Sequence, residues 1–154
     1  MKLHHEYSRF LQHTLYCILY TAHFLGEYMA DKQVSLLLFE VEGKKLLMDI
    51  ADLVEIIPIQ NITRLPNAGK NIAGMTNYRG EVIGVFNAAE ILAIPKKNKG
   101  HKSIIVVKYN KDKFGIPSNR VHEVVYLPAA SIKSGKAELN KEELQVISLK
   151  DFTF

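Results

Sequence analysis

Residues 71–87 carry the clearest structural signal in this chain, and they read Asn71-Ile72-Ala73-Gly74-Met75-Thr76-Asn77-Tyr78-Arg79-Gly80-Glu81-Val82-Ile83-Gly84-Val85-Phe86-Asn87. Two apolar runs with the composition of β-strands flank a short polar tip, Asn77-Tyr78-Arg79-Gly80. Because glycine permits a positive φ at such a tip, the segment predicts a β-hairpin. Arg79 would then point its guanidinium outward, where it could grip an acidic or polar partner. The alternative interpretation is a simple turn with a solvated arginine.

Short strands are predicted on both sides of this hairpin. Three precede it, at residues 34–41, 45–50 and 53–57, with a tight turn at Glu42-Gly43 and a stop at Pro58. After the hairpin, Asn87 and Glu90 have the spacing of a capping box, which predicts a short helix over residues 88–93. Residues 95–100 form a charged linker, and a closing strand is expected at residues 144–149, followed by a turn.

The strand pattern starts again 68 residues later. Residues 36–39 match 104–107, residues 45–48 match 113–116, and residues 53–57 match 121–125. The third match places Glu55 on Glu123. A constant offset over three strands predicts two similar β lobes, at about residues 34–93 and 101–152. Each lobe is too small to cover its own apolar faces, so we expect them to share an apolar interface.

Residues 1–28 differ in composition from the rest of the chain. They hold six of the fourteen aromatic residues, four of the six histidines and the single cysteine, Cys17. Apolar residues recur there at helical spacing and Gly26 follows them, which predicts an extra N-terminal helix. Its uncharged run is shorter than the roughly 20 residues that span a bilayer, and no signal-peptide cleavage site follows it.

Three interpretations of residues 1–28 are open. They could form a membrane-surface or packing helix, a genuine extension, or translated sequence ahead of a natural start at Met29. We favour the last, because residues 29–33 read like a protein N-terminus directly before the first strand. The main domain is therefore expected to cover residues 29–154.

Composition and charge leave binding functions open and give little support to catalysis. No His or Cys group has metal-ligand spacing, and neither His101 nor His122 has a serine or cysteine positioned beside it as a nucleophile, so we expect no metal, no cofactor and no enzymatic activity. The net charge of +4 permits an alternative function as a small β-barrel nucleic-acid-binding protein. Against it, the lysines are spread along the chain. The aromatic residues of the strands are also expected in the core, away from bases: Phe39, Phe86, Phe114 and Tyr126.

Over about residues 33–152 the chain resembles CheW-like domains, the coupling modules of bacterial chemotaxis. The resemblance is carried by the segments 48–50, 54–57, 62–66, 74–80, 103–107 and 121–125. It implies a mainly β fold with two SH3-like five-stranded β-barrel lobes, short helices and a common apolar interface. It also implies a cytoplasmic, non-catalytic adaptor at membrane receptor arrays. Such an adaptor joins the cytoplasmic tips of transmembrane chemoreceptors to the histidine kinase CheA.

The resemblance also implies roles for individual residues. In the family, the tip arginine and a strand glutamate face the receptor, which gives Glu55, Asn77, Arg79 and Gly80 a receptor-binding role. The ends of both barrels meet the regulatory domain of the kinase, which has the same fold. From the residues alone, an outward position on a half-buried strand also explains Glu55 and Glu123.

Two glycines are expected to be structural. Gly80 should have a positive φ in the turn, and Gly74, in mid-strand, should mark a bulge or a close backbone approach. The chain also departs from the family's usual pattern. It has Asn87 in place of an aspartate, and Ser118-Asn119 in place of Val-Asp before a later strand.

Overall fold

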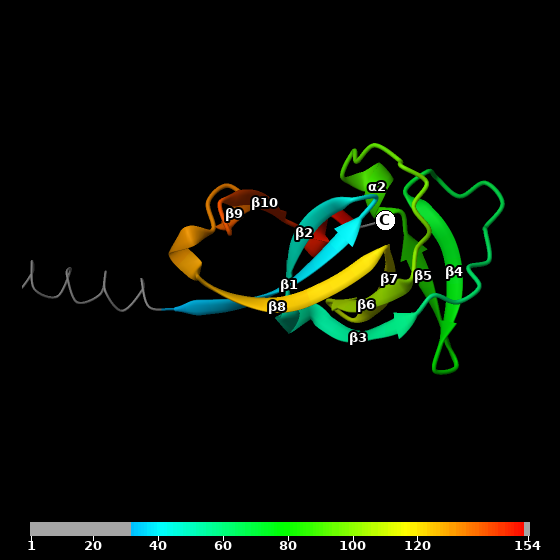
Figure 1. Ribbon diagram of the computed structural model, residues 1–154. Coiled ribbons are helices and arrows are strands. Elements are labelled where there is room, and N and C mark those ends of the chain that lie inside the picture. Colours follow the sequence, from blue (N-terminus) through cyan, green and yellow to red (C-terminus); the bar gives the residue numbers. More distant parts are fainter. Residues whose placement is uncertain (1–31, 153–154) are drawn as a thin grey trace, which may run out of the picture.

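The computed structural model describes residues 32–152, which form two five-stranded β-sheets with four short helical segments (Figure 1). The strands are β1 (Gln33–Val41), β2 (Lys44–Asp49), β3 (Leu53–Pro58), β4 (Ile72–Tyr78), β5 (Glu81–Phe86), β6 (Ser103–Tyr109), β7 (Asp112–Ser118), β8 (Arg120–Pro128), β9 (Lys136–Leu139) and β10 (Glu142–Val146). The helical segments are η1 (Ile50–Asp52), α2 (Ala88–Ile91), η2 (Ala129–Ser131) and η3 (Leu149–Phe152). The helix expected in residues 1–28 and the start at Met29 lie outside the described residues. No helix within residues 32–152 is long and apolar enough to cross a membrane.

The two sheets have equivalent strand orders. The first sheet runs β8-β1-β2-β10-β9, and the second runs β3-β6-β7-β5-β4. The repeat of 68 residues predicted from the sequence is kept in the pairing register: Leu37 faces Met48 in the first sheet, and Ile105 faces Ile116 in the second. Each sheet also contains one parallel pair, β2 with β10 and β5 with β7.

The sheets do not follow the expected division into consecutive lobes at residues 34–93 and 101–152. Strands β1 and β2 pair with β8 and β10, which come from the second repeat, whereas β3, β4 and β5 lie in a sheet with β6 and β7. Each repeat therefore contributes strands to both sheets. The sequence offset identifies equivalent strands, but the partner of a strand depends on tertiary packing.

Successive side chains of the central strands point to opposite faces, and the buried ones form three apolar clusters. In β1, Leu37 and Phe39 pack into a cluster shared by both sheets, while Leu36 and Leu38 point into the interior of the first sheet. In β6, Ile105 faces the shared cluster and Ile104 faces the interior of the second sheet. Because successive side chains point to opposite faces, a strand buried on both sides is apolar throughout. The shared apolar interface predicted from the sequence is thus present.

Three phenylalanine rings pack against one another in the shared cluster. Phe86 and Phe114 meet edge to face with centroids 4.9 Å apart, and Phe152 from η3 stacks on Phe114 at 6.0 Å. Phe39, Phe86 and Phe114 are buried as predicted, but Tyr126 is 66% exposed, so its assignment to the core was wrong. Tyr126 lies on β8, an outer strand of the first sheet, where one face is left uncovered.

The predicted capping box does not form. Helix α2 starts after Asn87 as expected, but it ends at Ile91, and the Asn87 side chain makes no capping hydrogen bond. Glu90 instead pairs with Lys96, with the carboxylate and amine 2.6 Å apart. A positive φ of 50° at Ala93 turns the chain away into the linker.

Candidate functional site

The tip of the β4–β5 hairpin is a two-residue turn. Tyr78 pairs with Glu81, which leaves Arg79 and Gly80 as the loop, with φ values of 52° and 85°. Positive φ at both central residues is the geometry of a type I′ turn, whose twist matches that of the strands. The positive φ expected at Gly80 is therefore observed. Asn77 Oδ1 accepts a hydrogen bond of 2.9 Å from the Gly80 N–H and fixes the turn.

Gly74 allows the loop of residues 59–71 to lie directly against β4. Its φ is 150°, and a Cβ added there would lie 2.3 Å from the carbonyl oxygen of Thr63. Thr63 and Met75 exchange two backbone hydrogen bonds of 2.8 and 2.9 Å, and the β4–β5 register shifts beside Gly74. The close backbone approach and the bulge expected at Gly74 are thus both present.

Arg79 is held by Glu55 of β3. Its Nε donates to Glu55 Oε2 and its Nη2 to Oε1, each at 3.1 Å, which is a bidentate pair. The Arg79 side chain is 73% exposed and that of Glu55 is 35% exposed. The guanidinium is accessible, as expected, but it folds onto a carboxylate and does not extend free into solvent.

Tyr78 completes this group, and its role is not apparent from the sequence pattern. Its hydroxyl donates a hydrogen bond of 2.7 Å to Glu55 Oε2, and its ring is buried. We call Glu55, Tyr78 and Arg79 the Glu55 cluster. Since β3 and β4 are the two outer strands of the second sheet, the Glu55 cluster links its two edges.

Electrostatics in the Glu55 cluster favour the charged pair. The hydrogen bonds from Arg79, and secondly from Tyr78, hold the pKa of the Glu55 carboxyl below its ordinary value. The hydrogen bond to Glu55 raises the pKa of the Tyr78 hydroxyl. The arginine therefore remains charged and the tyrosine protonated at neutral pH, so both act as hydrogen-bond donors.

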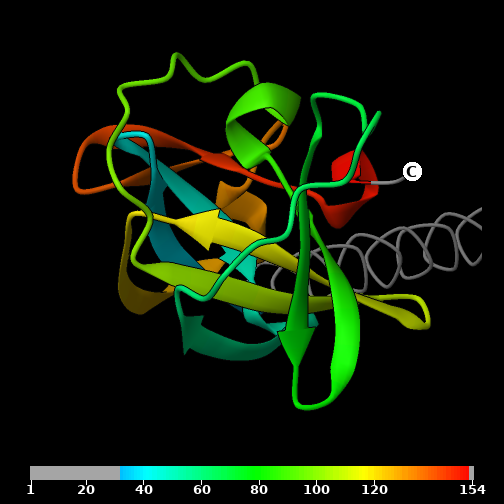
Figure 2. The ribbon, with the colours of Figure 1, turned by 90° about the vertical axis from the view of Figure 1, so that its right-hand side faces the viewer.

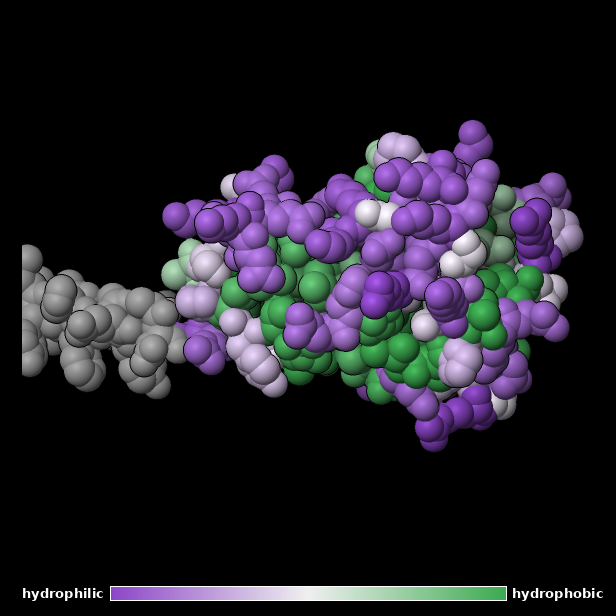
Figure 3. All heavy atoms as spheres, viewed as in Figure 1, coloured by the Kyte–Doolittle hydropathy of each residue, from purple (hydrophilic) through white to green (hydrophobic). Residues whose placement is uncertain are grey.

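Exposed apolar side chains alternate with Glu55 along β3 and also lie near the start of β5. Val54 and Ile56 occupy the exposed positions of β3, and Val82 at the start of β5 is 62% exposed. The apolar surface is visible along the lower edge of the molecule (Figure 3). An outward glutamate between inward apolar residues was the simpler expectation for β3, but the pattern is reversed. Glu55 shares its face with the buried Ile57, and the aliphatic neighbours face solvent.

The first sheet has no equivalent of the Glu55 cluster among the described residues. Glu123, the counterpart of Glu55, is exposed on β8 and takes part in none of the ion pairs of residues 32–152. The hairpin that corresponds to β4–β5 has Asn140-Lys141 at its tip. The two carboxylates therefore occupy equivalent places but different environments.

Comparisons with known proteins agree on one family. The family model described as a CheW-like domain matches residues 35–151. The chain is 33% identical over 92 residues to the chemotaxis protein CheW of Thermotoga maritima, a match that covers 60% of this chain and 61% of that relative's length. The crystal structure of the scaffolding protein TtCheW from Thermoanaerobacter tengcongensis superposes with a TM-score of 0.70 at 24% identity. This superposition covers 77% of this chain and 86% of that one, which shows a common fold.

Proposed function

The chain belongs to the CheW-like domain family, and we propose that it is a non-catalytic scaffold of bacterial chemotaxis that works by binding other signalling proteins. More specifically, it couples the cytoplasmic tip of a chemoreceptor to the histidine kinase CheA. The observation that carries this proposal is the Glu55 cluster with its exposed apolar neighbours.

The surface around the Glu55 cluster has the composition of a protein interface. Arginine and tyrosine are enriched among residues that dominate binding energy, and aliphatic side chains beside them lose water on contact. Val54 and Ile56 flank Glu55 in β3, and Val82 pairs across the hairpin with Asn77, the residue before Tyr78. A chemoreceptor tip that offers acidic or carbonyl groups beside apolar residues would complement this surface.

Arg79 is pre-oriented and still has donors to offer. Guanidinium carries five N–H groups, and the pair with Glu55 uses the Nε–H and one at Nη2. The remaining donors face solvent, since most of the side chain is exposed. Holding the side chain in one position before binding reduces the entropy that it loses when a partner docks.

The kinase is proposed to use a different surface. Its regulatory domain would meet the ends of the β-barrels, away from the Arg79-Gly80 turn. Two separate surfaces allow one molecule to hold both partners at once. Kinase binding and receptor binding should then respond independently to mutation.

The first test is Arg79→Ala. We expect it to weaken binding to a chemoreceptor cytoplasmic fragment by about 1–3 kcal/mol, because a charge-assisted hydrogen bond is lost. Thermal stability should stay nearly constant, since an exposed ion pair contributes roughly 0–1 kcal/mol. Isothermal titration calorimetry gives the affinity, and a thermal melt gives the stability.

Arg120→Ala provides the matched control. Arg120 is an exposed arginine on β8 of the first sheet. The Arg120→Ala variant should therefore bind the receptor fragment as tightly as the natural chain does. Both variants should retain the affinity for CheA. Undiminished receptor binding by Arg79→Ala would refute the site, and a large fall in its melting temperature would identify a structural arginine instead.

A further inference from the structure

A recess lies at the far end of the β4–β5 hairpin from the Arg79-Gly80 turn. Ile72 pairs with Phe86 there, next to α2, at the end opposite the turn in Figure 2. The loop of residues 59–71 forms one wall and the linker of residues 95–100 forms the other. The recess has a volume of about 760 Å³, within the range of small-molecule binding sites.

The floor of this recess is apolar and its walls are cationic. Val41, Ile72, Phe86, Ala88 and Pro117 contribute to the floor. The loop provides two of the cationic side chains and the linker two others: Arg64, Lys70, Lys96 and Lys99. A ligand that fits such a lining has an apolar body and a negative charge.

Only half of these cations are neutralised by protein carboxylates. Lys96 pairs with Glu90 at 2.6 Å, and Lys99 lies 3.6 Å from Glu40. Arg64 and Lys70 form no ion pair with any residue in the range 32–152. Lys96 chiefly, and Lys70 only more weakly, lowers the pKa of the Glu90 carboxyl. The loop therefore presents to the recess two positive charges that make no ion pair with the described residues.

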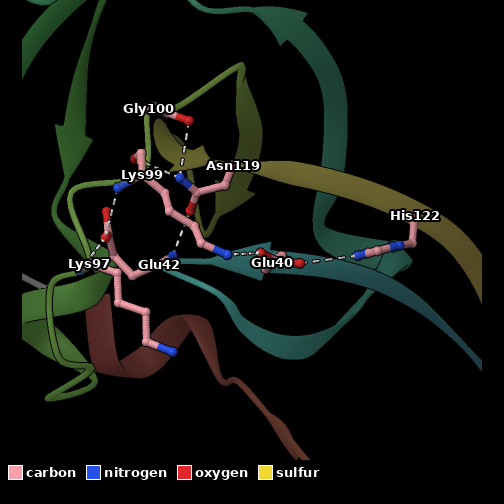
Figure 4. Close-up of polar contacts among 7 residues, drawn as sticks. All are labelled: Glu40, Glu42, Lys97, Lys99, Gly100, Asn119 and His122. Carbon is pink, nitrogen blue, oxygen red and sulfur yellow. Dashed lines mark hydrogen bonds and ion pairs between the residues drawn. The ribbon is translucent and has the colours of Figure 1, made fainter.

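The one carboxylate in the lining is already used. Glu42 is 5% exposed and accepts hydrogen bonds from the backbone N–H groups of Lys97 at 2.7 Å and Lys99 at 3.4 Å. His101 Nε2 lies 3.7 Å from its other oxygen. Figure 4 shows Glu42 turned toward the linker backbone, so it holds the linker wall and is not available to Arg64 or Lys70.

Asn119 fixes the same wall from its other side. Its Nδ2 donates to the carbonyl oxygens of Lys99 at 2.7 Å and Gly100 at 3.1 Å, and its Oδ1 accepts from the Glu42 N–H (Figure 4). The side-chain amide of Asn87 also lines the recess, and it makes no hydrogen bond to a described side chain or backbone group. A fixed wall and an unused amide are features of a preformed polar site.

We propose that this recess binds a small organic anion. The apolar body of the ligand lies on the floor beside Phe86, and its phosphate or carboxylate group lies against Arg64 and Lys70. Asn87 supplies an additional hydrogen bond. Bound there, the ligand bridges the loop to the linker, which connects the two repeats of the chain.

The test is an NMR titration of the ¹⁵N-labelled full chain with phenyl phosphate, benzoate and inorganic phosphate. Phenyl phosphate and benzoate distinguish the two anionic groups, and inorganic phosphate lacks the apolar body. We expect saturable shifts of the Gly69, Ala73 and Ala89 amides with an organic anion, and at least about tenfold weaker binding of inorganic phosphate. The affinity should fall as salt is added, because exposed cations are screened.

The double variant Arg64→Gln/Lys70→Gln should bind the organic anion at least about tenfold more weakly. Lys133→Gln removes a positive charge between η2 and β9, outside the recess, and should leave the affinity unchanged. A thermal melt establishes that each variant is folded. Absence of saturable shifts, or equal binding by the double variant, would overturn the proposal. Binding of a poly-glutamate peptide at these amides, with no binding of either organic anion, would assign the recess to an acidic protein segment and overturn it as well.

Discussion

At the scale of single residues, Glu55 organises the proposed receptor site. It receives hydrogen bonds from Arg79 and Tyr78, and these bonds lower its carboxyl pKa. When folding lowers the pKa of a carboxyl, that group stabilises the folded protein at every pH above the pKa that it has in the unfolded chain. This contribution disappears as the pH falls through the lower pKa of the folded state. Acid should therefore release Arg79 only well below neutral pH.

The pKa of Glu55 can be measured directly. We expect Arg79→Ala to raise it, because the hydrogen bond from Arg79 is the largest cause of its lowering. Tyr78→Phe should raise it less. The side-chain carboxyl ¹³C shift of Glu55, followed by NMR between acid and neutral pH, gives each value. An unchanged pKa in Arg79→Ala would mean that the bidentate pair is not populated in solution.

Gly74 and Gly80 are expected to differ sharply in their tolerance of a side chain. A Cβ at Gly80 meets no atom within 4 Å. Gly80→Ala should therefore lower the free energy of unfolding by only about 1–2 kcal/mol, because alanine disfavours the positive φ at this position. At Gly74 the same Cβ strikes the Thr63 backbone, and we expect Gly74→Ala to cost about 2–5 kcal/mol. Gly74→Asp should cost more, because it adds a charge. Urea midpoints rank the three variants, and equal midpoints for the two alanine variants would contradict this ranking.

At the scale of elements, strand positions were predictable and side-chain partners were not. Turn residues and apolar alternation placed β1 to β7 within one or two residues, and β8 extends three residues beyond its expected end, since both signals are local. The short strand β9 was missed because only four residues form it. The Glu55–Tyr78 bond joins strands 23 residues apart, and no local pattern carries that information. The capping box at Asn87 failed for a related reason, because Glu90 found a partner in the linker.

The linker is the element whose anchoring is most open to test. Asn119→Ala removes three hydrogen bonds of the side chain, one accepted from Glu42 and two donated to Lys99 and Gly100. We expect the free energy of unfolding to fall by about 1–3 kcal/mol. Amide hydrogen exchange should accelerate at Lys97 and Lys99, whose N–H groups bond to Glu42. Asn119→Asp is the informative companion, because it keeps the acceptor and loses both donors. Unchanged exchange in Asn119→Ala would show that Glu42 alone holds the linker.

At the scale of the whole molecule, the exchange of strands between repeats binds the two halves together. The first repeat contributes β1 and β2 to one sheet and β3, β4 and β5 to the other. The alternating apolar pattern of a strand is equally compatible with a partner strand from the same repeat and with one from the other repeat. The sequence therefore indicated the number of equivalent strands and the shared core, but it left the partners undetermined.

Cutting the backbone tests this exchange. We expect a protein cleaved at an inserted protease site between Pro95 and Lys96 to stay in one particle, because neither fragment contains a complete sheet. The fragments should coelute in size-exclusion chromatography and separate only in denaturant. Uncut protein carrying the same insertion is the control. Separation in native buffer would show that the halves are independent.

The exchanged strands also bear on the ancestry of the fold. Two half-length chains related by a two-fold axis could make every strand pairing seen here, each lending one part to either sheet. Such a symmetric dimer would present every surface twice and could not distinguish one partner from another. A tandem duplication that fused the halves would free each copy to diverge. Here one tip has become Arg79-Gly80 and its counterpart Asn140-Lys141. A single chain can thereby carry two unlike faces, as the proposed binding of two different partners requires.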